Sequence, residues 1–323
     1  MQNLRKLAKP MIASLILGSL ALAGCSGGGN EGTTTEGPGD GSAMSAASTA
    51  ASPAPMSEQA APESGGNINL VYVEWSSCVA STEVIKAVLE SQGYDVKTTS
   101  VSAAALYAAI AGGDADATVC AWLPTTHKNY YAKTKDRLDN LGPNLNKGTK
   151  LGLVVPDYVT IDSIADLSAN ADKFQNRIIG IDPGAGEMGL TQDVVKQYDL
   201  PLKLVSGSGA TMTAALKSAI DSKQWVVVTG WSPHWMWARW DLKYLDDPKG
   251  VYGEPDSIDT LARKGLKQDM PGAYAILDAY QWTAKQMEQV MAMNQKDGTT
   301  PEDNARQWIK DHPEAVQSWT SGS

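Results

Sequence analysis

Tryptophan is concentrated in one stretch of this chain, since five of its ten tryptophans fall between Trp225 and Trp240. The chain also has eleven tyrosines but a single phenylalanine, so rings with a polar edge outnumber purely apolar ones. The electron-rich face of an indole attracts cations that water holds weakly, above all quaternary ammonium groups. This composition indicates a binding site for such a cation.

Three tryptophans follow segments that are predicted to be strands. Trp75, Trp122 and Trp231 come after the segments Ile68–Glu74, Ala117–Ala121 and Val226–Thr229. Ligands of open α/β sheets bind beyond the carboxyl ends of the strands. One tryptophan at such a place is most often a packing residue, but three equivalent ones are hard to explain by packing. We therefore expect a cage of three indole rings, each contributing up to about 2 kcal/mol to cation binding.

The other tryptophans are interpreted as structural. Trp235, Trp237 and Trp240 do not share the strand-end position, and they are expected to wedge their lobe together or to line a rim. Trp282, Trp308 and Trp319 belong to a helical C-terminal region and are expected in its core.

A second candidate site lies in the glycine-rich segment Gly180–Gly189, where a strand is predicted to end and a helix to begin. The exposed backbone N–H groups at such a helix start bind carboxylate or phosphate, and Gly186 and Glu187 occupy this place. The segment is neither a Walker loop nor a dinucleotide fingerprint, and a plain tight turn is the alternative. His127, five residues after Trp122, is a candidate hydrogen-bond partner for a carboxylate, or else a packing residue. His234 is a weaker candidate.

Strands alternate with helices of about ten residues along most of the chain, which predicts two lobes of the α/β class with parallel sheets. From Ser257 onward the pattern is almost wholly helical, with helix starts predicted at Thr283 and Thr300. Residues 68–155 and 245–320 are assigned to lobe 1 and residues 156–244 to lobe 2. We expect the ligand in the cleft between the lobes, which close by hinge motion near Pro156 and Tyr244.

The first 24 residues read as a signal peptide, with a basic start, an apolar stretch and small residues before Cys25. The ending Leu22–Cys25 resembles the bacterial lipoprotein box, which implies an exported protein that is lipid-anchored at Cys25 and faces the periplasm or the cell exterior. An ordinary secretory signal is the alternative. Residues 25–67 are rich in small and polar residues, and we expect them to be a disordered tether.

The net charge of −9 at pH 7 argues against nucleic acid or an anionic membrane face as a partner. Cys78 and Cys120 have no further Cys or His at ligand spacing, which argues against a zinc site. No metal and no cofactor is expected. In an exported protein the two cysteines form either a disulfide or two small buried apolar positions.

The sequence argues against two other classes of protein. A hydrolase needs a nucleophile or a pair of carboxylates, but Ser206–Ala210 departs from Gly-x-Ser-x-Gly, and Asp246 with Asp247 reads as a solvated turn. We therefore expect no enzyme activity. A sugar-binding protein would need more Asp, Asn and Arg around its aromatic rings.

Five segments resemble the substrate-binding proteins of glycine betaine/proline betaine ABC importers, a family of the type II periplasmic-binding-protein fold. The likeness runs over nearly all of residues 68–319, and it is carried by Val71–Trp75, Ala121–His127, Gly180–Gly186, Thr229–Met236 and Asp241–Pro248.

The resemblance implies that Trp75, Trp122 and Trp231 surround the ligand's trimethylammonium group. The amides of Gly186 and Glu187, together with His127, would hold its carboxylate. The Glu187 side chain adds a carboxyl group there, which would favour choline, and a preference for choline or carnitine is the alternative. The resemblance also implies delivery to an ABC permease and its ATPase for osmoprotection, with the binding protein expected to be a monomer.

Overall fold

The structure is a computed structural model that describes residues 65–322, all of which belong to one body of contacting residues. The predicted signal peptide, Cys25 and nearly all of the predicted tether lie outside the described residues. Strand β1 begins at Asn67, the last residue assigned to that tether. Within residues 65–322 no helix has the length and apolar character that crossing a membrane requires.

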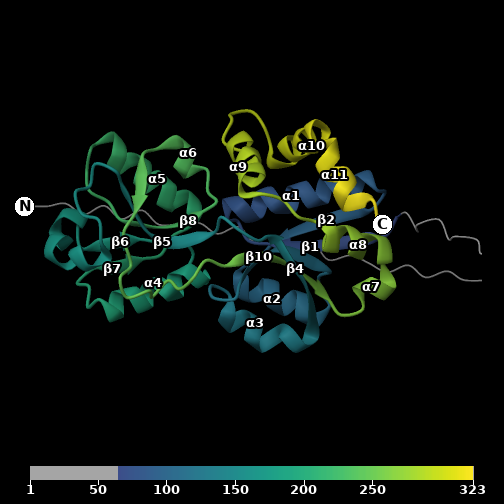
Figure 1. The fold of residues 1–323 in the computed structure, drawn as a ribbon, viewed down its shortest axis with the longest axis horizontal. Coiled ribbons are helices and arrows are strands. Elements are labelled where there is room, and N and C mark those ends of the chain that lie inside the picture. The colour runs from purple at the N-terminus through teal and green to yellow at the C-terminus, as the bar shows by residue number, and fades with distance from the viewer. Residues whose placement is uncertain (1–64, 323) are drawn as a thin grey trace, which may run out of the picture. The chain divides into compact units, whose positions relative to one another are not determined.

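Each lobe is built on a five-stranded sheet with helices on both faces (Figure 1). The first sheet has the order β2-β1-β3-β10-β4. Its strands are β1 (Asn67–Tyr72), β2 (Asp95–Ser100), β3 (Ala117–Leu123), β4 (Leu138–Leu145) and β10 (Ser257–Arg263). Strand β1 is parallel to β2 and β3, whereas β10 runs antiparallel to both of its neighbours.

The second sheet has the order β7-β6-β8-β5-β9. Its strands are β5 (Lys150–Pro156), β6 (Arg177–Ile179), β7 (Lys203–Val205), β8 (Val228–Ser232) and β9 (Leu242–Tyr244). Strand β6 is parallel to β7 and β8, and β5 is antiparallel to β8. Both sheets are therefore mixed, and the prediction of parallel sheets was wrong for β5 and β10.

The helices of the first lobe come from both ends of the described chain. They are α1 (Ser76–Ser91), α2 (Ala103–Gly112), α3 (Lys128–Thr134), α7 (Leu266–Asp269), α8 (Pro271–Ala279), α9 (Ala284–Met293), α10 (Pro301–Asp311) and α11 (Pro313–Thr320). The second lobe contains α4 (Gly186–Gln197), α5 (Gly209–Asp221) and α6 (Met236–Arg239). Short 3-10 turns occupy Lys135–Arg137, Ile164–Asp166 and Ser168–Phe174.

The predicted helix starts at Thr283 and Thr300 are confirmed, because each side chain accepts a hydrogen bond from the backbone three residues on. The prediction of an almost wholly helical region from Ser257 was wrong at its beginning. Residues Ser257–Arg263 form β10, which fills the position between β3 and β4.

The chain crosses between the sheets twice, and the first crossing lies earlier than predicted. The boundary placed at residue 155 falls inside β5, which pairs with β8 and β9 of the second sheet. The crossing therefore lies between Leu145 and Lys150. The return lies between β9 and β10, and Leu245 and Tyr252 still pack into the core of the second lobe.

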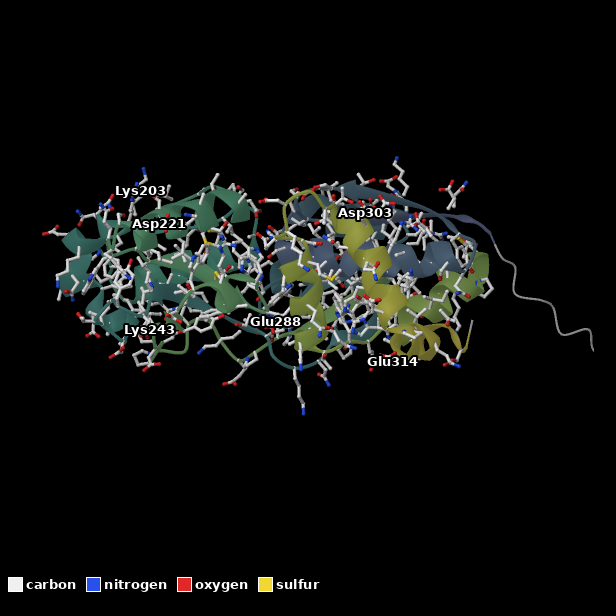
Figure 2. The ribbon with its side chains drawn as sticks, turned by 90° about the horizontal axis from the view of Figure 1, so that it is seen from above. Lys203, Asp221, Lys243, Glu288, Asp303 and Glu314 are labelled. Carbon is white, nitrogen blue, oxygen red and sulfur yellow. A yellow bond between two sulfur atoms is a disulfide. The ribbon has the colours of Figure 1, made fainter. Side chains whose placement is uncertain are left out.

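The C-terminal helices pack back on the first lobe, with Trp282, Trp308 and Trp319 buried in its core as predicted. Lys86 of α1 pairs with Glu302 of α10 at 3.2 Å on the surface of this contact. Figure 2 shows charged side chains such as Lys203, Asp303 and Glu314 on the outside of the lobes. The interior of each lobe is mainly apolar.

Candidate ligand-binding site

A small cavity lies where the two lobes meet. The three strand-end tryptophans, both candidate anion-binding residues and His127 all line it. The lining residues are Trp75, Ser77, Trp122, Thr126, His127, Leu151, Ile181, Ala185, Gly186, Glu187 and Trp231.

The sheets explain why these segments meet. Parallel strands that pair in one sheet end at the same edge. The site residues lie at or beyond the carboxyl ends of β1 and β3 in one lobe and of β6 and β8 in the other, with Trp122 and Trp231 next to the last residues of β3 and β8. Trp75, Trp122 and Trp231 are only 4–6% exposed. Indole rings from both lobes are thus desolvated around one cavity, which is the condition under which cation–π attraction is strongest.

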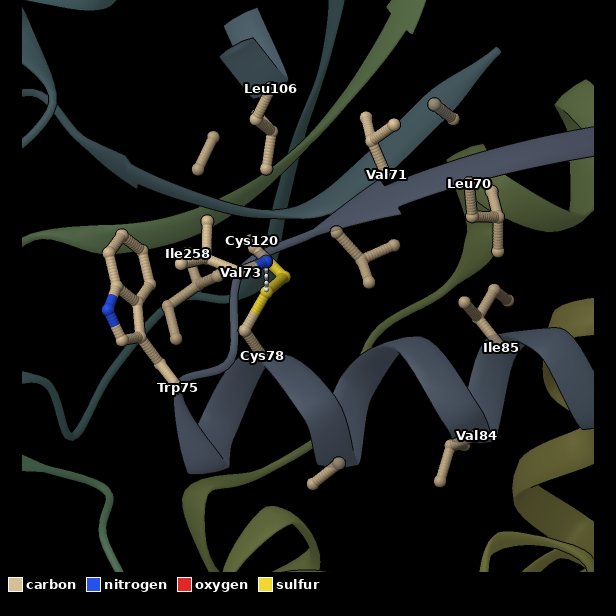
Figure 3. Packing of buried hydrophobic residues seen from close by; sticks show 14 of the residues in the cluster. Leu70, Val71, Val73, Trp75, Cys78, Val84, Ile85, Leu106, Cys120 and Ile258 are labelled. Carbon is tan, nitrogen blue, oxygen red and sulfur yellow. Dashed lines mark hydrogen bonds between the residues drawn. A yellow bond between two sulfur atoms is a disulfide. The ribbon is translucent and has the colours of Figure 1, made fainter. Parts of the chain in front are cut away.

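A disulfide joins Cys78 to Cys120 and links the two segments of the first lobe that carry cage tryptophans (Figure 3). Cys78 lies in the first turn of α1, three residues after Trp75, and Cys120 lies in β3, two residues before Trp122. Both cysteines are buried. The disulfide therefore restricts the distance between the two strand ends.

His127 is 2% exposed, and its hydrogen bonds determine its tautomer. The backbone N–H of Trp122 donates to His127 Nδ1 at 3.1 Å. Burial lowers the His127 pKa to about 4, although the charge of Asp256 opposes this. The ring is therefore neutral at pH 7, and because Nδ1 accepts a hydrogen bond, its proton lies on Nε2. His127 thus presents one N–H donor, as carboxylate binding requires.

The loop that carries His127 is held by Asp256, the residue directly before β10. Both carboxylate oxygens of Asp256 accept backbone hydrogen bonds, from Thr125 at 2.7 Å and Thr126 at 2.9 Å. The backbone N–H of His127 donates to the carbonyl of Trp122 at 2.9 Å. The positions of His127 and Trp122 are thus coupled.

Helix α4 begins at the cavity wall with Gly186 and Glu187 as its first two residues. The first N–H groups of a helix have no partner within the helix, and the N-cap residue Ala185 provides no side-chain cap. These amides lie at the positive end of the helix dipole, where an anion is stabilised. The candidate residues for cation binding and for anion binding therefore line one cavity.

The Glu187 side chain is 3% exposed. Burial raises its pKa to about 8, which the backbone N–H groups of Gly230 and Gly152 offset only in part. Glu187 is therefore mostly protonated at pH 7 and adds no full negative charge beside the anion site.

His234 and the tryptophan cluster lie mostly outside this cavity. A larger groove of about 510 Å³ adjoins it and is lined by His234, Trp235 and Trp240, with Trp231 shared between the two. The Trp237 indole N–H donates to the Trp231 carbonyl at 2.9 Å. Trp237 thus contacts the backbone of a cage residue.

Two kinds of site residue were missed by sequence reasoning. Thr126 lines the cavity, and its buried hydroxyl has no hydrogen-bond partner among the residues that the structure describes. Asp182 accepts a hydrogen bond from the Trp75 indole at 2.8 Å. The Asp182–Gly186 turn had been singled out only for its amides, and no local pattern indicates the contact of Asp182 with the other lobe.

Two α/β lobes that line a shared cavity define a solute-binding protein of the type II periplasmic-binding-protein fold. The chain belongs to the family described as the substrate-binding domain of ABC-type glycine betaine transport systems, whose model matches residues 66–311.

Three known proteins show the extent of the similarity. Lactococcal OpuAC, solved in a closed-liganded conformation with glycine betaine, is 47% identical with a TM-score of 0.75, over 79% of this chain and 99% of that one. An ABC-transporter choline-binding protein in complex with choline is 26% identical with a TM-score of 0.74, over 79% and 92% of the two chains. The glycine betaine/carnitine transport binding protein GbuC of Listeria monocytogenes is 49% identical over 154 residues. That match spans 47% of this chain and about half, 51%, of the Listeria protein.

Proposed function

We propose that this protein captures glycine betaine, or a closely related quaternary-ammonium zwitterion, for an ABC importer. One observation carries the proposal: three desolvated indole rings, an uncapped helix start and a histidine N–H donor line the same cavity. The rings suit a trimethylammonium group, and the donors suit a carboxylate. The solved complex of lactococcal OpuAC with glycine betaine, at 47% identity, supports this ligand.

The mechanism is ligand-stabilised closure. Trp75, Trp122 and His127 belong to one lobe, whereas Gly186, Glu187 and Trp231 belong to the other. A ligand that contacts both sets binds the closed form more tightly than the open form, and this differential affinity shifts the population toward closure. The closed protein then delivers its ligand to a membrane permease that an ATPase drives, in support of osmoprotection.

The remaining features of the proposal follow from the sequence. A lipid on Cys25 would anchor the protein at the cell envelope, with residues 25–67 as the tether. The protein acts as a monomer and binds its ligand without chemical conversion.

Choline is the second candidate, because the choline-binding relative shares the fold at 26% identity. Choline has no carboxylate to satisfy the amides of Gly186 and Glu187 or the N–H of His127. We therefore propose that the zwitterion binds more tightly than choline.

Titration calorimetry tests the ligand class. Glycine betaine should bind more tightly than choline, and 3,3-dimethylbutanoate, which replaces the charged nitrogen by carbon, should bind at least tenfold more weakly. Equal affinity for this isostere, whose head group is uncharged, would show that the rings do not recognise a cation.

Substitution of the rings tests the assignment of residues. Trp→Ala at position 75, 122 or 231 should weaken glycine betaine binding tenfold or more, on the order of 1.4 kcal/mol. Trp308→Phe, in the core of the C-terminal helices, is the matched control and should leave the affinity unchanged. Near-normal binding by all three cage variants, with their folding checked by thermal unfolding, would rule out the cage.

A further inference from the structure

Three contacts between the lobes fall on one short loop, residues Asp182–Gly186, which leads from β6 into α4. This loop lies in the second lobe, and its partners in the first lobe are Trp75, Thr126 and Tyr130. The same loop ends at the amides that form the anion site. Closure of the lobes and completion of the site therefore involve the same five residues.

The first contact joins a cage ring to the opposite lobe. The Trp75 indole N–H donates to Asp182 Oδ2 at 2.8 Å. The backbone of Trp75 is held in the first lobe, because its N–H donates to the Val73 carbonyl at 2.7 Å and its carbonyl accepts from Val79 at 2.8 Å. The ring is therefore fixed from both lobes at once.

The other two contacts bring the backbone of the loop against the first lobe. The Tyr130 hydroxyl donates to the Gly184 carbonyl at 2.7 Å. A β-carbon built on Gly186 would lie 2.1 Å from the Thr126 carbonyl oxygen, so this approach requires a glycine. The Asp182 side chain is absent from the cavity wall, and its hydrogen bond to the Trp75 indole links it to the site.

We propose that Asp182 is a positioning residue that acts as a latch, coupling closure of the lobes to the orientation and charge distribution of the Trp75 ring. This inference rests on the proposed function, since it assumes that Trp75 faces a ligand cation. A carboxylate that accepts from the indole N–H strengthens the hydrogen bond through its charge and draws the N–H proton toward itself. The ring face thereby becomes more electron-rich and attracts a cation more strongly.

The latch has two separable effects, one on the rate of ligand dissociation and one on the attraction of the ring for a cation. It forms only when the lobes meet, so its loss should accelerate ligand dissociation and change association much less. The electrostatic effect of the latch acts on a cationic head group alone. Its loss should therefore weaken binding of glycine betaine more than binding of 3,3-dimethylbutanoate, whose tert-butyl head is uncharged. A residue that merely supports the fold would lower the stability of the ligand-free protein and affect both ligands equally.

Stopped-flow binding of glycine betaine to the full-length protein tests the latch with Asp182→Ala and Asp182→Asn. Asp182→Ala should raise the dissociation rate at least tenfold, with the association rate within threefold of the wild type. Asp182→Asn retains an acceptor oxygen without the charge. Its dissociation rate should therefore lie between those of the wild type and Asp182→Ala. Asp193→Ala, on the exposed face of α4, is the matched control and should behave as the wild type.

An unchanged dissociation rate in both Asp182 variants would overturn the latch, and so would equal losses of affinity for glycine betaine and for 3,3-dimethylbutanoate. If Asp182→Ala unfolds at lower temperature without ligand, the near-isosteric Asp182→Asn carries the test alone. The two proposals fail differently: a wild-type protein that does not bind glycine betaine refutes the proposed function, whereas normal wild-type binding with unaffected variants refutes only the latch.

Discussion

Glu187→Gln tests the electrostatics of the cavity wall through protein stability. Folded Glu187 keeps its proton until about pH 8, whereas its ordinary pKa of 4.5 applies to the unfolded chain. The unfolded state therefore binds fewer protons between these values, and the free energy of unfolding falls as the pH rises through this window. Below pH 4.5 both states are protonated, and the residue contributes no pH dependence.

The magnitude follows from the size of this window. Each pH unit inside this window changes the free energy of unfolding by about 1.4 kcal/mol. Ionisation of Glu187 in the unfolded chain should therefore lower the free energy of unfolding of the wild type by up to about 3 kcal/mol between pH 5 and pH 7. Glutamine has the same shape and does not ionise, so Glu187→Gln should lack this loss. The buried histidines His127 and His234 are present in both proteins, and their contributions cancel in the difference.

Urea unfolding of the ligand-free proteins at pH 5, 6 and 7 measures this difference. The slope against pH is compared rather than the absolute stability, because the buried glutamine amide changes stability equally at each pH. Glu254→Gln, at an exposed position, is the control and should follow the wild type. If Glu187→Gln and the wild type lose stability in parallel from pH 5 to pH 7, the carboxyl is not held protonated and the reasoning is wrong.

Three further predictions concern ligand binding. Gly186→Ala should weaken glycine betaine binding at least tenfold in calorimetry, because the added methyl group meets a carbonyl of the other lobe, whereas Gly189→Ala on the same helix has open space and should bind normally. Replacing Cys78 and Cys120 by serine should lower the free energy of unfolding by about 2–4 kcal/mol in denaturant titration. The same double variant should bind glycine betaine more weakly. Unchanged affinity would show that the disulfide does not hold Trp75 and Trp122 in place. Raising the pH from 7 to 9 ionises Glu187, whose pKa is about 8. The new negative charge repels the carboxylate of glycine betaine and attracts choline, so the Kd of glycine betaine should rise and the Kd of choline should fall. Glu187→Gln should abolish both changes.

The sequence predicted the parts of the fold that depend on local pattern. Alternating strands and helices, and the caps at Thr283 and Thr300, were visible because their residues interact with near neighbours. Strand β10 was not visible in the sequence, because its polar residues form hydrogen bonds with residues that are distant in the chain. Asp259 accepts from Asn140 at 2.8 Å, and Thr260 accepts from Asn144 at 3.1 Å. Such pairing leaves no periodic signal in the strand itself.

The residues of the candidate site also divide into those that the sequence predicted and those that it did not. Trp75, Trp122 and Trp231 were found because ligands of α/β sheets bind at strand ends, and these rings do line one cavity. Their contact with a ligand stays a prediction. Asp182 and Thr126 were missed because their roles depend on how one lobe faces the other, which no local spacing encodes.

The position of β10 has a consequence for how the protein is made. Strand β4 joins the first sheet only through β10, which follows the whole second lobe in the chain. A growing polypeptide can complete the second sheet once Tyr244 has been synthesised, whereas the first must wait for Arg263. Until then β3 keeps an open edge, which is prone to pair with other chains, and pairing over such long separations is slow. The first lobe, whose synthesis begins first, is therefore the last to complete its sheet.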